Sequence, residues 1–341
     1  MSRRRHLNAE IKLTRLAFQP GEVICGMLLV DSSNDNGISK IDVKLFGLAK
    51  VFCRDEEFPE HHYGRPVFLH NEKILIDRNA IVYQKPEPLL IEIDDAYRYN
   101  NEPLNGICPP GCHSDPSGLH AGHHGFPFEF HLPTSGLESS FTCNNCPVSI
   151  KYHIIASIMD EDGTVLMECS QPITIVKPSH ASISQCQSSN VVAKCIDLKK
   201  SCSVYASMKL AKTCYKPTEP MCAVITINNR WKGSLKYVHF NIVQRVSYTA
   251  ILGVTSYRRT LFKNIDLTGV GLPPSQQKIL SGMSFSFSPQ YHVPALIPSF
   301  EIPDCMKVDY VAKLTVGRSQ NEVFGEITIP ITIITDIVSK L

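Results

Sequence analysis

Cysteine and histidine residues gather in the first half of this 341-residue chain. Thiolate and imidazole are the ligands that zinc prefers, and Cys143-Asn-Asn-Cys146 has the C-x-x-C spacing of a zinc knuckle. The other arm is less regular, because three residues separate Cys108 from Cys112 and a long gap follows before the next cysteine. We therefore expect no metal and no cofactor. A zinc-stabilised β protein is kept as an alternative, with these candidate ligands: Cys108, Cys112, His113, His120, His123, His124, Cys143 and Cys146.

The C-x-x-C pair also raises the question of redox catalysis. A reactive pair of the thioredoxin type usually lies at the start of a helix. Here Pro147 and the alternating residues after it lead into a strand instead. A thioredoxin-like catalytic role is therefore not expected.

Basic residues open the chain and could collect phosphate groups, because guanidinium groups bind phosphate bidentately. The alternative is a solvated tail followed by the outward face of a strand. The formal net charge of the whole chain is only +2, so no surplus marks a nucleic-acid binder. The candidate phosphate or partner contacts are Arg3, Arg4, Arg5, Lys12 and Arg15.

Common catalytic motifs are absent from the sequence. We find no H-E-x-x-H, no G-x-S-x-G and no phosphate-binding loop. Gly269-Val-Gly271 is followed by Leu272 and two prolines, which cannot open a phosphate-binding helix. The sequence therefore favours binding over catalysis, and we expect no enzyme.

Strands must carry these side chains, because alternation of apolar and polar residues dominates the chain. It is clear at 38–46, 148–156 and 236–243, and no long window has helical periodicity. With 23 Pro and 19 Gly between such runs, the pattern favours antiparallel β-sandwiches. The stretch 105–127, rich in Gly, His and Pro, is expected to be irregular, as a surface loop or a site.

An internal repeat indicates two similar halves. Residues 12–22 align without a gap with residues 209–219 through the pattern K-L-x-[RK]-x-x-[FY]-x-P-[GT]-E. Ile150-Lys-Tyr152 in the first half is likewise similar to Val308-Asp-Tyr310 in the second. The Pro-containing turn should redirect each first strand into the next. Because Thr218 stands where the first copy has Gly21, a left-handed turn residue is not expected in the second copy.

These residues resemble the arrestin fold, and in particular the arrestin domain-containing proteins, or α-arrestins. Residues 18–26 are similar to the family's opening turn, and 122–133 to its G-x-H-x-F-P-F-x-F-x-L-P signature. Residues 139–141 with 148–156 resemble its S-S-F…V-x-Y-x-I-x-A stretch. Residues 215–219 resemble the opening of the carboxy-terminal module. The matching motif positions, expected to be structural, are Phe18, Pro20, Gly21, Glu22, Phe126, Phe128, Phe130, Leu132, Pro133, Tyr152, Tyr215, Pro217 and Glu219.

The resemblance implies an all-β protein of two tandem arrestin-like antiparallel β-sandwich modules, immunoglobulin-like in type. We place the amino-terminal module at 1–177, a Ser-rich linker at 178–201 and the carboxy-terminal module at 202–341. The implied function is that of a non-enzymatic adaptor, which binds cytoplasmic tails or loops of membrane proteins and links them to endocytic, sorting or ubiquitination machinery.

One departure concerns recruitment of ubiquitin ligases. Many α-arrestins carry P-P-x-Y motifs for WW domains, but the pairs Pro109-Pro110 and Pro273-Pro274 are not followed by such a tyrosine. A tissue-specific interaction scaffold without ligase recruitment is therefore an alternative.

The expected location is the cytoplasm, with peripheral association at the plasma membrane or endosomes left open. No apolar segment follows the basic start, and no stretch reaches the roughly 18 apolar residues of a membrane span. Thirteen cysteines, an odd number scattered along the chain, favour reduced thiols.

Overall fold

The structure is a computed structural model that describes residues 7–33, 37–54, 68–85, 119–143, 146–182, 189–198, 202–251 and 258–338. None of these residues is helical, and strands make up most of them. Within these ranges, therefore, no helix is long and apolar enough to cross a membrane. The expectation of an all-β chain is confirmed.

The chain divides into two compact units, each made of several segments. The first contains residues 1–47, 74–136 and 152–174, and the second contains 48–73, 137–151 and 175–341. Three long strands run from one unit into the other. They are β4 (Ile38–Arg54), β5 (Phe68–Gln84) and β8 (Val148–Asp160).

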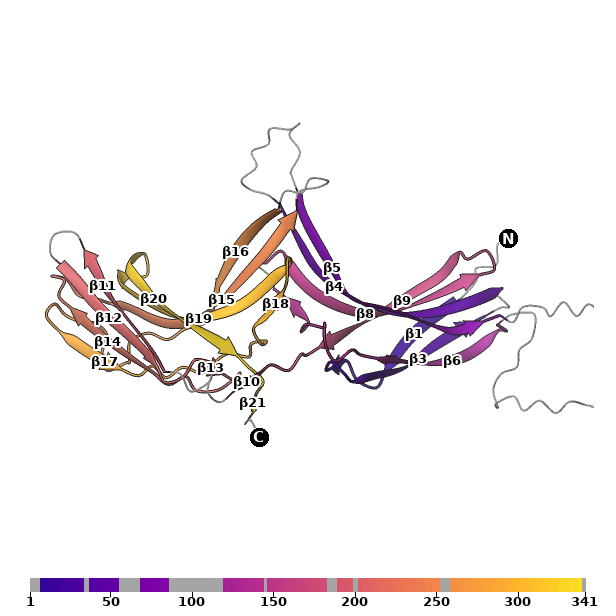
Figure 1. Cartoon of the computed structure of the whole chain (residues 1–341), viewed down its shortest axis with the longest axis horizontal. Coiled ribbons are helices and arrows are strands. Elements are labelled where there is room, and N and C mark those ends of the chain that lie inside the picture. The colour runs from indigo at the N-terminus through magenta and orange to yellow at the C-terminus, as the bar shows by residue number, and fades with distance from the viewer. Residues whose placement is uncertain are drawn as a thin grey trace, which may run out of the picture. The chain divides into compact units, whose positions relative to one another are not determined.

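Two sheets build the first unit (Figure 1). One has three antiparallel strands, in the order β1 (Leu7–Leu13), β3 (Val23–Ser32) and β6 (Gly122–His131). The other continues β5, β4 and β8 with β9 (Val165–Ile175) and β2 (Ala17–Phe18). β7 (Phe141–Thr142), which belongs to the second unit, pairs with β8. Alternation places one face of each strand in the core, as the buried side chains of Leu28 in β3 and Ile154 in β8 illustrate.

The second unit contains a four-stranded sheet in the order β11 (Asn190–Leu198), β12 (Cys202–Leu210), β14 (Ala223–Asn229) and β17 (Ser284–Phe287). Another path runs β13 (Cys214–Tyr215), β20 (Glu322–Ile333), β19 (Met306–Ser319) and β15 (Tyr237–Ile251). Two strands flank it: β16 (Arg258–Asp266) pairs with β15, and β18 (Phe300–Ile302) pairs with β19. A short parallel pair joins β10 (His180–Ser182) to β21 (Asp336–Val338).

The segment 178–201, expected as a linker, contains two of these strands. β10 pairs with β21, and all nine residues of β11 pair with β12. Backbone pairing therefore gives residues 180–182 and 190–198 regular structure, although the sequence around them is rich in Ser.

The expected irregular stretch 105–127 needs a partial correction. Residues 105–118 lie outside the described part of the chain, but Gly122 already begins β6 and pairs with Ser32. Pro127 is tolerated because β6 has only one strand partner in the described sheet, so a missing backbone N–H can face away from the ladder. Strand pairing, which composition does not reveal, orders this part of the stretch.

The repeat is visible in the core. Tyr152 on β8 and Tyr310 on β19, which occupy equivalent places in the two halves of the sequence, are both almost fully buried. Gly47 faces Tyr152 so closely that an added Cβ would lie 2.3 Å from the ring. The aromatic residue of the sequence pattern is therefore a core residue in both copies.

Candidate interaction surface

The three-stranded sheet of the first unit has an inner face in the core and an outer face in solvent. Its registers place outward side chains of β1, β3 and β6 side by side. Met27 and Leu29, in the middle strand, are 38% and 40% exposed. Three rows cross this outer face: Asn8, Asp31 and His123; Glu10, Leu29 and Gly125; and Lys12, Met27 and Pro127.

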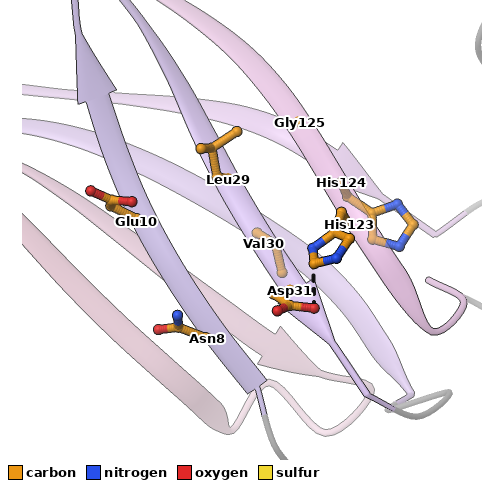
Figure 2. Close-up of a pocket in the computed structure, with 8 residues that line it drawn as sticks. All are labelled: Asn8, Glu10, Leu29, Val30, Asp31, His123, His124 and Gly125. Carbon is orange, nitrogen blue, oxygen red and sulfur yellow. Dashed lines mark ion pairs between the residues drawn. The ribbon is translucent and has the colours of Figure 1, made fainter.

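A shallow hollow lies on this surface. Gly125 has no side chain to cover Leu29, and an added Cβ there would approach the Met27 sulfur to 3.3 Å. The hollow has a volume of about 390 Å³ (Figure 2). It is lined by Asn8, Glu10, Leu29, Val30, Asp31, His123, His124 and Gly125.

Charged and polar groups border the hollow in pairs. His123 Nδ1 lies 3.3 Å from Asp31 Oδ1, as the dashed line in Figure 2 marks. Glu10 forms an ion pair with Lys12 on the same strand. His124 Nε2 lies 2.8 Å from the His120 carbonyl oxygen, which fixes the orientation of that ring.

The backbone adds a second means of recognition. β1 and β6 are the outer strands of this sheet among the described residues, and each has one strand partner in it. An open strand edge can accept an extended peptide by main-chain hydrogen bonding. With apolar side chains flanked by paired charges, the surface is suited to binding a polypeptide.

The predicted basic contacts are spread over different environments. Arg3, Arg4 and Arg5 lie outside the described residues. Lys12 faces outward and pairs with Glu10, whereas Arg15 lies in the turn after β1, where its Nη2 is 2.9 Å from Glu22 Oε2. Lys12 and Arg15 are thus each engaged by a carboxylate, and phosphate binding by this set stays a prediction.

Arg15 belongs instead to a turn motif that we call the first clasp, formed by Arg15, Phe18, Gln19 and Glu22. The guanidinium carbon lies 4.7 Å from the centre of the buried Phe18 ring. The Gln19 backbone N–H donates to Glu22 Oε2 at 2.6 Å. This backbone hydrogen bond, together with the Arg15 charge, lowers the pKa of Glu22 although desolvation opposes it.

The second copy of the repeat forms the same arrangement, the second clasp, from Lys212, Tyr215, Lys216 and Glu219. Lys212 Nζ lies 5.2 Å from the Tyr215 ring centre and pairs with Glu219. The Lys216 backbone N–H donates to Glu219 Oε2 at 2.9 Å. Burial opposes ionisation of Glu219, but the hydrogen bonds from Lys212 and Lys216 lower its pKa overall.

The prediction for the second turn was wrong. Thr218 has φ of 66°, in the left-handed region where Gly21 has 86°. The clasp explains the conformation: Thr218 N–H donates to the Val293 carbonyl oxygen at 2.8 Å, while Glu219 accepts from Lys216. These contacts fix the turn and outweigh the cost of the β-branched side chain.

The remaining motif residues serve mainly as core. Phe128 and Phe130 are buried, with ring centres 5.9 Å apart, whereas Phe126 is half-buried and lies 5.8 Å from Tyr83. Leu132 is also buried, and Pro133 accepts a hydrogen bond from Gly21 N–H at 3.2 Å. In the sequence, Pro20 lies between Gln19 and Glu22 of the first clasp, and Pro217 lies between Lys216 and Glu219 of the second.

The candidate zinc ligands are divided by the fold. His123 and His124 lie on β6, while Cys143 and Cys146 lie in the loop before β8. Cys108, Cys112 and His113 are outside the described residues. In the part of the chain that the structure describes, no group of three or more His, Cys, Asp or Glu residues is arranged to hold a metal ion.

Comparison with known proteins agrees with the fold. Residues 200–336 match the family model of the arrestin (or S-antigen) C-terminal domain. The chain is also 31% identical to Protein ttm-2 of Caenorhabditis elegans, over 331 residues that cover 95% of this chain and 88% of that protein. Similarity of this extent and degree shows the family, and this chain therefore belongs to the arrestin domain-containing proteins.

Proposed function

We propose that the protein is a non-enzymatic cytoplasmic adaptor that binds tails or loops of membrane proteins and links them to endocytic or sorting machinery. Family membership supports a trafficking or adaptor-type scaffold in general terms. The observation that carries the proposal is the similarity to an arrestin-domain protein over 95% of the chain.

The outer face of β1, β3 and β6 is the surface we assign to cargo. It combines an exposed apolar centre at Met27 and Leu29 with carboxylates at Glu10 and Asp31. An extended cargo segment would pair with an open edge and place alternate side chains over this centre. Recognition would then depend on Leu29 more than on any buried residue.

The test is affinity capture of membrane proteins from cells by the full-length tagged chain, with Leu29→Asp as the variant. Val224→Asp is the matched control, because Val224 is also an exposed strand residue (47%) but lies on β14 of the second unit. We expect transmembrane proteins with the wild type and the control, and their loss with Leu29→Asp. Equal capture by all three proteins would show that the assigned surface does not bind cargo. If the wild type captured no more membrane protein than an unrelated β-sandwich does, the adaptor function would be overturned.

Phosphate recognition is tested with the same assay. A variant with Gln in place of Arg3, Arg4, Arg5 and Lys12 removes four of the five candidate basic contacts and keeps Arg15, because the first clasp uses it. If the phosphate contact exists, phosphatase treatment of the lysate and this variant should reduce capture to the same level, and the two together should reduce it no further. Unchanged capture in both would contradict it.

The scaffold without ligase recruitment is a second candidate, favoured by the lack of a P-P-x-Y motif in the sequence. It is distinguished by the composition of the captured set. Cargo captured without any WW-domain ubiquitin ligase supports it, whereas a captured ligase favours a role in ubiquitination.

A further inference from the structure

The loop between β7 and β8 holds two cysteines, Cys143 and Cys146, which are three positions apart in the sequence. The pair Thr142 and Ser149 closes its base by strand pairing. Inside the loop, Cys146 N–H donates to the Cys143 carbonyl oxygen at 3.3 Å. A turn closed by such a hydrogen bond keeps its first and fourth Cα atoms within about 7 Å. A disulfide spans Cα atoms about 4.4–6.8 Å apart, so the backbone already holds the two residues near bridging distance.

The two thiols also meet through their side chains. Both residues are half-buried, and the Cys143 side chain hydrogen-bonds to that of Cys146. Burial, with the nearby Cys143, raises the pKa of Cys146 to about 12, although the charge of Lys263 opposes this. Cys146 is therefore kept as a thiol in the reduced chain, and because the thiolate is the attacking form, we assign the first attack to Cys143.

The residue after this pair is fixed to the sheet. Phe52 N–H, near the end of β4, donates to the Pro147 carbonyl oxygen at 2.8 Å. Strand pairing at Thr142 and the Phe52 hydrogen bond at Pro147 thus tether both ends of the segment that carries the two cysteines. The anchoring lowers the entropic cost of closing the ring.

We propose that Cys143 and Cys146 form a dithiol site that closes reversibly to a disulfide within the loop by exchange with glutathione disulfide. The Cys143 thiolate attacks one sulfur of glutathione disulfide, forms a mixed disulfide and releases one glutathione thiolate, which takes up the proton that Cys143 lost. Cys146, losing its proton, then attacks the Cys143 sulfur and displaces the second glutathione. Two protein thiols are oxidised and one glutathione disulfide is reduced to two glutathione molecules.

This site differs from a catalytic C-x-x-C pair, because no helix begins at Cys143 and a strand follows Pro147. The site takes its oxidant from the glutathione pool and modifies this chain alone. It does not depend on the proposed adaptor function.

The experiment uses the full-length reduced chain in mixtures of reduced and oxidised glutathione, followed by acid quenching, alkylation and intact-mass measurement. Digestion after glutamate releases the fragment from Ser139 to Glu161, which contains Cys143 and Cys146 as its only cysteines. We expect this fragment to lose two hydrogens and to escape alkylation in oxidised glutathione, and to regain both thiols in excess reduced glutathione. Two alkylated thiols, or a persistent glutathione adduct without closure, would overturn the proposal.

Variants separate closure from other thiol chemistry. Cys146→Ser should stop at the mixed disulfide with glutathione, because the resolving thiol is gone, and Cys143→Ser should prevent the fragment from losing two hydrogens. Cys195→Ser is the matched control, since Cys195 is an exposed cysteine on β11, and it should leave closure unchanged. Thermal unfolding of each reduced variant verifies that it is folded. If a variant is unfolded, the mass of the wild-type fragment in oxidised and reduced glutathione alone decides whether the disulfide forms.

Discussion

Thr218 occupies the left-handed turn position that Gly21 occupies in the other copy of the repeat, with φ of 66° and 86°. A β-branched residue in this region costs roughly 1–2 kcal/mol. Asn tolerates the region better, because its short polar side chain can hydrogen-bond locally. We expect Thr218→Asn to raise the free energy of unfolding by about 0.5–1 kcal/mol, measured by denaturant titration.

A substitution at the equivalent position of the first copy is the control for this prediction. Gly21→Thr should lower the free energy of unfolding by about 1–2 kcal/mol, since it places a β-branched residue at positive φ. An added Cβ would also approach Thr134 Cγ2 to 3.2 Å. A destabilised Thr218→Asn together with a neutral Gly21→Thr would show that the conformation carries no strain.

Ionisation of Glu219, in the second clasp, should make the stability of the protein depend on pH. Its folded-state pKa lies below the ordinary value of 4.5, so the folded chain binds this proton less tightly than the unfolded chain does. The resulting stability is present above about pH 4.5 and is lost as the pH falls through the folded-state pKa. We therefore expect Glu219→Gln to be less stable than the wild type at pH 7, with a difference that shrinks in acid.

Chemical denaturation at several pH values tests this dependence. Glu322→Gln is the matched control, because Glu322 forms an exposed pair with Arg318 at 3.5 Å and such pairs contribute little. A Glu219→Gln difference that stays constant from neutral to acid pH would contradict a contribution from the ionised carboxylate.

Phe128 and Phe262 are phenylalanines on strands with opposite environments. Phe128 is 6% exposed on β6, whereas Phe262 is 75% exposed on β16. Phe128→Ala should cost about 3–5 kcal/mol, because it removes apolar contact and leaves a cavity. Phe262→Ala should change the free energy of unfolding by less than about 0.5 kcal/mol. Comparable losses measured by denaturant titration would contradict the assignment of the signature phenylalanines to the core.

Tyr310 should make stability depend on pH in the alkaline range. Gln244 Nε2 donates to its hydroxyl at 3.1 Å, and the hydroxyl donates to the Ile297 carbonyl oxygen at 3.0 Å. Burial raises the pKa of Tyr310 from 10.0 to about 12, although the Gln244 hydrogen bond opposes this. The folded chain then holds this proton more tightly, so stability is lost as the pH rises from about 10 towards about 12.

Tyr310→Phe separates these effects. At neutral pH we expect it to cost about 1–3 kcal/mol, because buried polar partners of the hydroxyl lose their hydrogen bonds. The alkaline loss of stability should be smaller than in the wild type, since one tyrosine with a raised pKa is gone. An identical pH dependence of unfolding in both proteins would show that Tyr310 ionises as freely in the folded chain as in the unfolded one.

The sequence by itself determined the elements and the family. Strand alternation is a local property with a period of two residues, so it predicted the all-β fold. Of the three signature phenylalanines expected to be structural, Phe128 and Phe130 are buried and Phe126 is half-buried. The internal repeat could also be recognised from the sequence, because residues 12–22 and 209–219 align without a gap. The motifs at 18–26 and 122–133 carried the resemblance to arrestins, which the comparisons then confirmed.

Only the tertiary structure decided which side chains meet. Asp31 and His123 come together because β3 and β6 pair in one register, although 91 residues lie between them in the chain. Composition marked residues 122–127 as irregular, but pairing with β3 orders them. At Thr218 the local preference against positive φ gave way to the hydrogen bond that its N–H donates to the Val293 carbonyl oxygen and to the hydrogen bonds within the second clasp. Local propensities are worth at most one or two kcal/mol per residue, and a set of tertiary contacts can outweigh them.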